Sequence, residues 1–129
     1  MTARPTILVV DDDSAVRTLV GAFLSAAGYA VVEAVDGQEA LDIFHQHSTI
    51  TLVISDVIMP GMSGPELCDR LLQIRPTLKV LFISGYVERS DLGGVELLPK
   101  PFAPAELLQR LQKMIGSRPR PARRQRRNQ

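Results

Sequence analysis

Short apolar runs alternate with amphipathic segments along most of the chain. The runs are rich in β-branched residues, which favours buried strands, and they cover residues 7–10, 29–34, 52–55, 79–83 and 96–98. Most of the segments between them carry apolar residues at spacings of three and four, which favours helices. Strand and helix therefore alternate about five times, and this predicts an α/β fold whose parallel sheet is covered on both faces.

The first expected helix follows the first apolar run. Ser14 is a residue type that caps helices, and Gly28 is one that ends them. The apolar residues between these two positions fall on one helix face, and that face is expected to be the inner one. They are Val16, Leu19, Val20, Phe23, Leu24 and Ala27.

Three more helices are expected later in the chain. A short one covers residues around 40–44, the next opens at Gly64–Pro65 and ends at Pro76, and the last starts at residue 103 or 104. The inner residues expected for the last two helices are Leu67, Leu71, Leu72, Ile74, Leu107, Leu108, Leu111 and Ile115.

Polar residues follow four of the expected strands. They are Asp11, Asp12 and Asp13 after the first strand, Asp56 after the third, Ser84 after the fourth and Lys100 after the fifth. In an open parallel sheet, chemistry collects in the crevice at the carboxyl ends of the strands. If the first strand lies centrally beside the third, these side chains meet in one crevice.

These residue types suit a particular chemistry. Several carboxylates without a thiolate or a paired histidine are the oxygen ligands that Mg²⁺ prefers. A lysine and a hydroxyl nearby suit phosphoryl oxygens. A carboxylate beside a metal can act as the nucleophile and form an aspartyl phosphate, while the metal and lysine offset charge on the transferring group.

Composition indicates one ordinary globular domain. The 129 residues are 45% hydrophobic and 22% charged, and the chain shows no signal-peptide pattern and no apolar run long enough for a membrane span. Cys68 is the only cysteine, so an intramolecular disulfide is excluded and a reducing, cytoplasmic location is expected.

The net charge of +1 hides an asymmetry. Six of the fifteen basic residues are arginines within residues 118–127, so residues 1–117 hold nine basic against fourteen acidic residues, or about −5. The tail has no hydrophobic period and is expected to be disordered. A solubilising extension is the preferred interpretation, with contact to an acidic partner as the alternative.

Four motifs carry a resemblance to a known family. In chain order, the stretches ILVVDDDSAVR, VISDVIMPGMSGPEL, LFISGY and LLPKPF resemble the receiver domain of bacterial two-component response regulators. The resemblance implies a flavodoxin-like three-layer sandwich with strand order 2-1-3-4-5. We therefore expect an N-terminal extension over residues 1–5, a receiver domain over 6–116 and a basic tail over 117–129.

The resemblance also implies roles for individual residues. Asp56 matches the phosphoacceptor, and Asp11 and Asp12 match the acidic pair that binds Mg²⁺. The backbone carbonyl of Ile58 is expected to be a further metal ligand.

Two more matches lie at the ends of the later strands. Ser84 matches the hydroxyl that bonds the phosphoryl group, and Lys100 matches the lysine that contacts its oxygens. The Lys100–Pro101 bond is often a cis peptide in this family. Asp13 lies outside the acidic pair and is expected to favour the helix start.

The implied function is that of a signalling phosphoacceptor. A histidine kinase or histidine phosphotransfer protein would donate the phosphoryl group. The domain would then switch conformation toward an effector or relay the group. The only catalysis expected is self-phosphorylation and self-dephosphorylation at Asp56, and no DNA-binding domain is expected within these residues.

Two departures from the family pattern bear on the output. Leu97 stands where relatives carry an aromatic residue that swings inward, so the usual rotamer switch is missing. The stretch between Ser84 and Lys100 is shorter than usual and contains Gly93–Gly94. The family's fourth helix is therefore expected to be short, irregular or absent.

Two rival interpretations stay open at this point. A haloacid-dehalogenase-like phosphatase uses a strand-end D-x-D, and Asp11 and Asp13 have that spacing. It leaves Asp56 without a clear role. The other rival is an unphosphorylated interaction module that acts through the arginine-rich tail.

Overall fold

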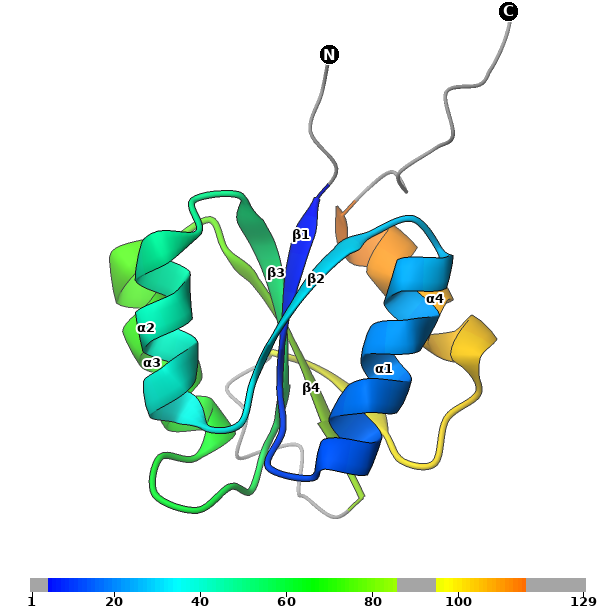
Figure 1. Cartoon of the computed structure of the whole chain (residues 1–129), viewed down its shortest axis with the longest axis horizontal. Helices are drawn as coiled ribbons and strands as arrows, with labels where there is room; N and C mark the ends of the chain where they lie inside the picture. The colour runs from blue at the N-terminus through cyan, green and yellow to red at the C-terminus, as the bar shows by residue number, and fades with distance from the viewer. Residues whose placement is uncertain (1–4, 86–94, 116–129) are drawn as a thin grey trace, which may run out of the picture.

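A five-stranded parallel sheet forms the centre of the protein (Figure 1). The computed structural model describes residues 5–85 and 95–115. The strand order is β2-β1-β3-β4-β5, and every neighbouring pair is parallel, which confirms the expected flavodoxin-like arrangement. The strands are β1 (Thr6–Val10), β2 (Ala30–Ala34), β3 (Ile50–Asp56), β4 (Lys79–Ser84) and β5 (Glu96–Pro99).

Helices cover both faces of the sheet, as the sequence predicts. In Figure 1, α2 and α3 lie on one side and α1 and α4 on the other. The helices within the described residues are α1 (Ser14–Ala26), α2 (Gly37–Gln46), α3 (Gly64–Ile74) and α4 (Pro104–Ile115). None of these helices is long and apolar enough to cross a membrane.

The sheet divides the core into two halves, as the interior strand β1 shows. Its side chains alternate, so Leu8 and Val10 join the cluster under α2 and α3, whereas Ile7 and Val9 join the cluster under α1 and α4. All five residues of β1 are buried, as expected for a parallel strand with both faces covered. Burial on both faces agrees with the interior position of this strand, between β2 and β3.

The helix starts differ in detail from the sequence predictions. The N-cap of α1 is Asp13 and not Ser14, because the Asp13 carboxylate accepts hydrogen bonds from the backbone N–H groups of Ala15 and Val16 at 2.9 and 3.3 Å. Gly28 follows the helix with a φ of 100°, in the left-handed conformation that suits glycine at a helix end.

Two apolar residues assigned to inner helix faces are exposed. Leu19 of α1 is 54% exposed, and Ile74, the last residue of α3, is 45% exposed. The buried stripe of α1 runs through Val20 and Leu24 and leaves Leu19 at its solvent edge. On α3 the stripe consists of Leu67, Cys68 and Leu71.

Some expectations lie outside the described residues. The short or irregular helix expected after Ser84 falls within residues 86–94. The N-terminal extension lies almost wholly in residues 1–4, and the basic tail lies in residues 116–129.

Candidate functional site

The sheet order brings four strand ends to one edge. β1 and β3 are neighbours, with Val10 opposite Ser55, so Asp11 and Asp56 follow adjacent positions. β5 lies beside β4, and the backbone N–H of Lys100 donates to the carbonyl of Ser84 at 2.9 Å. The polar residues expected in one crevice are therefore gathered at the carboxyl edge of the sheet.

Three carboxylates converge at this edge. One oxygen each from Asp11, Asp12 and Asp56 lies within 4.8 Å of the others. Asp11 is fully buried, the side chain of Asp56 is 16% exposed and Asp12 is exposed. Asp13 does not belong to this group, because its carboxylate caps α1. Such a group of hard oxygen ligands could hold a magnesium ion.

Lys100 faces the same group. Its Nζ lies 3.7 Å from Oδ2 of Asp11 and 3.9 Å from Oδ2 of Asp56. The Lys100–Pro101 peptide bond is cis. The two distances place the ammonium between the carboxylates of Asp11 and Asp56, where it could also contact an anionic group delivered to Asp56.

Asp11 is only partly satisfied by the protein. Its Oδ1 accepts a hydrogen bond from the backbone N–H of Asp13 at 2.9 Å, whereas its buried Oδ2 has no hydrogen-bond partner among the described residues. Burial raises the pKa of Asp11, the Asp13 N–H opposes that shift, the charge of Asp56 adds to it and Lys100 opposes it. A cation beside Oδ2 would supply the missing partner.

The Asp56 carboxylate is held by one oxygen and open at the other. Its Oδ1 accepts a hydrogen bond from the backbone N–H of Val57 at 2.8 Å. Its Oδ2 is the oxygen nearer Lys100. One oxygen is therefore fixed by the backbone while the other faces the crevice.

Gly64 allows the next helix to begin close to Asp56. Its N–H donates to the carbonyl of Val57 at 2.8 Å, and a Cβ at this position would lie 2.2 Å from the carbonyl oxygen of Asp56. Any side chain would push α3 away from the loop after β3. Glycine at this position thus keeps the loop beside Asp56 compact.

The remaining expected residues lie at the same edge. Ser84 is the last residue of β4 and is 5% exposed. Ile58 lies two residues after Asp56, and its side chain is 65% exposed.

Sequence reasoning missed one residue that contacts the acidic turn. An η nitrogen of Arg17 donates to the backbone carbonyl of Asp11 at 2.6 Å, and its Nε lies 3.3 Å from Oε1 of Glu33. Arg17 was present in the motif that carried the resemblance, but its partner on β2 depends on the strand register. Spacing along the chain gave no signal for this contact.

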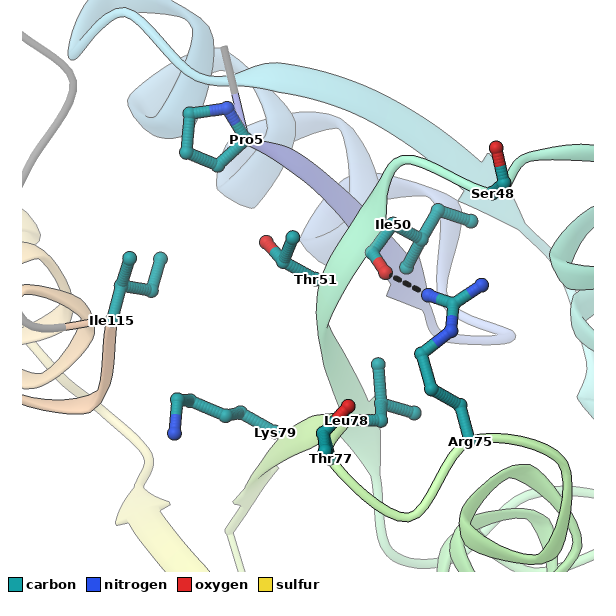
Figure 2. Close-up of a pocket in the computed structure, with 9 residues that line it drawn as sticks. All are labelled: Pro5, Ser48, Ile50, Thr51, Arg75, Thr77, Leu78, Lys79 and Ile115. Atoms are coloured by element: carbon teal, nitrogen blue, oxygen red, sulfur yellow. Dashed lines mark hydrogen bonds between the residues drawn. The ribbon is translucent and has the colours of Figure 1, made fainter. Parts of the chain in front are cut away.

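A pocket of about 350 Å³ lies away from these carboxylates (Figure 2). Its lining includes Ile50 at the start of β3 and Lys79 at the start of β4, so it lies at the amino ends of these strands. Arg75 donates a hydrogen bond to the carbonyl of Ile50 there. The lining contains no acidic residue, so this pocket is separate from the cluster of Asp11, Asp12 and Asp56.

Comparison with known proteins places this geometry in a family. Residues 7–112 match the family described as response regulator receiver domain. The chain is 35% identical to the sensor kinase CckA of Brucella abortus, over 89% of this chain and 13% of that protein. It is 41% identical to the response regulator MprA of Mycolicibacterium vanbaalenii, over 84% of this chain and 49% of that protein.

A solved structure agrees with these sequence matches. The receiver domain from the hybrid histidine kinase CckA superposes with a TM-score of 0.75 at 44% identity, over 85% of this chain and 98% of that one. The chain spans about half or less of the length of the two curated relatives. Fold, acidic crevice and sequence agree: the chain belongs to the response regulator receiver domain family of two-component signalling systems.

Proposed function

We propose that this receiver domain accepts a phosphoryl group on Asp56 from a phosphohistidine donor, with Mg²⁺ bound beside it. One observation carries the proposal. Oxygens of Asp11, Asp12 and Asp56 lie within 4.8 Å of one another, and Lys100 faces two of these side chains. Together they form a cation site next to an accessible nucleophile and an ammonium group.

The residues present fit a magnesium ion. Asp11, Asp12 and Asp56 would hold it, and the family resemblance adds the backbone carbonyl of Ile58. The buried Oδ2 of Asp11 supports this assignment because it lacks a hydrogen-bond partner among the described residues. A bound Mg²⁺ supplies positive charge that offsets the charge of a phosphoryl group during transfer.

The chain's own residues would carry out the transfer. The backbone N–H of Val57 holds Oδ1 of Asp56, so Oδ2 attacks the phosphorus. A P–O bond forms while the P–N bond of the phosphohistidine breaks, and its electron pair returns to the imidazole. Lys100 would contact the phosphoryl oxygens, and the hydroxyl of Ser84 would bond one of them afterwards.

This chemistry describes a signalling module with slow self-hydrolysis. Water attacking the phosphorus would release phosphate and restore the Asp56 carboxylate. The donor would be a histidine kinase or a histidine phosphotransfer protein. Position 97 holds a leucine, and this side chain is already buried in the same cluster as Phe82. The inward swing of an aromatic side chain at this position is therefore not the output. Relay of the phosphoryl group, or a different conformational response, fits better.

Intact-mass measurement tests the acceptor directly. Incubation with acetyl phosphate and Mg²⁺ should add one phosphoryl group to the wild type, and EDTA should prevent the addition. Asp56→Asn should abolish the adduct. Asp42→Asn, which removes a carboxylate from α2, is the matched control and should leave it intact. An adduct that survives in Asp56→Asn would overturn the proposal.

The same experiment separates the rivals. Asparagine still caps helices well, so Asp13→Asn should fold, keep α1 and accept the phosphoryl group normally. Loss of the adduct in Asp13→Asn would favour the dehalogenase-like phosphatase. Removal of residues 118–129 should also leave the adduct unchanged. Biological function lost with the tail but retained in Asp56→Asn would favour the tail-dependent interaction module.

A further inference from the structure

We propose that Arg17 and Glu33 form a brace that positions Asp11 for cation binding. Arg17 touches none of the three carboxylates that would hold the metal; it bonds the backbone of one of them. It is therefore a positioning residue. The inference rests on the proposed magnesium site, and it adds that this site depends on two residues outside the crevice.

The contacts of Arg17 define the brace. One η nitrogen donates to the backbone carbonyl of Asp11 at 2.6 Å, and Nε lies 3.3 Å from Oε1 of Glu33. The Arg17 side chain is 14% exposed and that of Glu33 is 43% exposed. A mostly buried guanidinium with two partners in different directions has one orientation, so it can hold the carbonyl of Asp11 in place.

The sheet register explains why Glu33 reaches Arg17. Glu33 of β2 lies opposite Val9 of β1, and Val9 packs in the cluster under α1. Neighbouring strands present paired residues on the same face, so Glu33 also faces α1. Gly21 of α1 provides the room, because a Cβ there would lie 3.0 Å from Oε2 of Glu33.

The brace completes the anchoring of the Asp11 peptide. The N–H of Asp11 donates to the carbonyl of Ala34 at 3.2 Å, and its carbonyl accepts from Arg17. Its Oδ1 accepts from the N–H of Asp13. These three contacts leave Oδ2 as the free oxygen facing Lys100. Removing Arg17 would release the carbonyl and let Oδ2 leave its position beside Asp56.

Charge and position predict opposite effects, which makes the inference testable. Arg17 carries a positive charge near a cation site, so through charge alone its loss would strengthen Mg²⁺ binding. If Arg17 acts by positioning Asp11, its loss would instead weaken Mg²⁺ binding. Residues that orient metal ligands typically change metal affinity by about tenfold or more when mutated.

Calorimetric titration with Mg²⁺ in the absence of any phosphodonor tests the brace. Arg17→Met should bind Mg²⁺ about tenfold more weakly than the wild type. Arg17→Lys keeps the charge but replaces the two contacting nitrogens of the rigid guanidinium by a single Nζ, so it should also weaken binding. Arg70→Met removes an exposed arginine of α3 and should leave the affinity unchanged. Circular dichroism establishes that each variant is folded.

Each outcome decides a different question. Unchanged or tighter binding by Arg17→Met would overturn the brace while leaving the magnesium site intact. If Arg17→Met fails to fold, Arg17→Lys decides alone, and wild-type affinity in that variant overturns the brace. No binding by the wild type would overturn the magnesium site itself, and the brace with it.

Discussion

At the scale of single residues, the crevice holds more negative charge than Lys100 offsets. Burial raises the pKa of Asp11, and the charge of Asp56 adds to the shift. The folded protein therefore holds this proton more tightly than the unfolded chain, and ionisation of Asp11 lowers stability as pH rises above 3.8.

Asp11→Asn should accordingly stabilise the metal-free protein. Asparagine keeps the acceptor for the N–H of Asp13 and removes one of three crowded charges. We expect a gain of about 1 kcal/mol at neutral pH, measured by thermal unfolding in EDTA, and a smaller gain near pH 3.8. A loss of stability at neutral pH would show that Lys100 already compensates the Asp11 carboxylate.

Cys68 should be inert despite being a free thiol. It is 4% exposed on the inner side of α3, and burial raises its pKa to about 11, with the charge of Asp69 adding to the shift. The thiolate is therefore scarce at pH 8. Alkylation by iodoacetamide at that pH should be slow in the folded protein and fast in urea. Fast labelling of the folded protein would contradict the expected inertness.

The same raised pKa of Cys68 predicts a loss of stability at high pH. The thiol of the unfolded chain ionises first, so the free energy of unfolding should fall between about pH 9 and 11.

At the scale of elements, helix existence was easier to predict than helix detail. Apolar spacing located the buried residues of α1 and α4, yet it also placed Leu19 and Ile74 inside, where the structure exposes them. The spacing of apolar residues identifies one face of a helix, but the packing of that helix on the sheet determines how many residues of the face are buried. Asp13 and Ser14 are both good caps, and only the backbone conformation shows that Asp13 is the cap.

Arg75 joins three elements at the amino end of the sheet. It caps the end of α3, and it donates a hydrogen bond to the carbonyl of Ile50 in β3 (Figure 2). Its guanidinium also lies over the ring of Phe44 in α2, 4.5 Å from the ring centroid. Arg75→Ala should destabilise the protein by about 2 kcal/mol in urea unfolding, because a charge-assisted bond and a cation–π contact are lost.

A matched variant shows whether that effect is specific. Arg70→Ala removes an exposed arginine from the same helix and should change the free energy of unfolding by less than about 0.5 kcal/mol. Phosphorylation by acetyl phosphate should persist in Arg75→Ala, because Arg75 lies near the other end of β3 from Asp56. Equal destabilisation by both variants would mean that the interelement contacts of Arg75 contribute little.

At the scale of the whole molecule, sequence reached the fold class and the crevice but not its supports. Alternating strands and helices predicted the α/β class, and the family resemblance added the strand order. The polar residues could be located because each stands at the end of a strand or directly after it. The link between Arg17 and Glu33 was missed because it depends on the register of β1 against β2, which no local pattern encodes.

The cluster of Asp11, Asp12 and Asp56 should also link metal binding to global stability. A ligand that binds only the folded state stabilises it by RT ln(1 + [L]/Kd), about 2.7 kcal/mol at a hundredfold excess over Kd. Added Mg²⁺ should therefore raise the thermal midpoint of the wild type, and the midpoint should continue to rise gradually at Mg²⁺ concentrations above Kd. Asp12→Asn should reduce this rise, because it removes one of the three converging carboxylates.

Asp36→Asn is the control for a general effect of charge. Asp36 caps α2 through a hydrogen bond from the N–H of Glu39, and asparagine preserves that role. This variant should respond to Mg²⁺ as the wild type does. If Asp36→Asn and Asp12→Asn lose the response equally, Mg²⁺ would be acting by diffuse screening of an acidic surface. A loss confined to Asp12→Asn would tie the stability of the whole domain to the crevice at the carboxyl edge of its sheet.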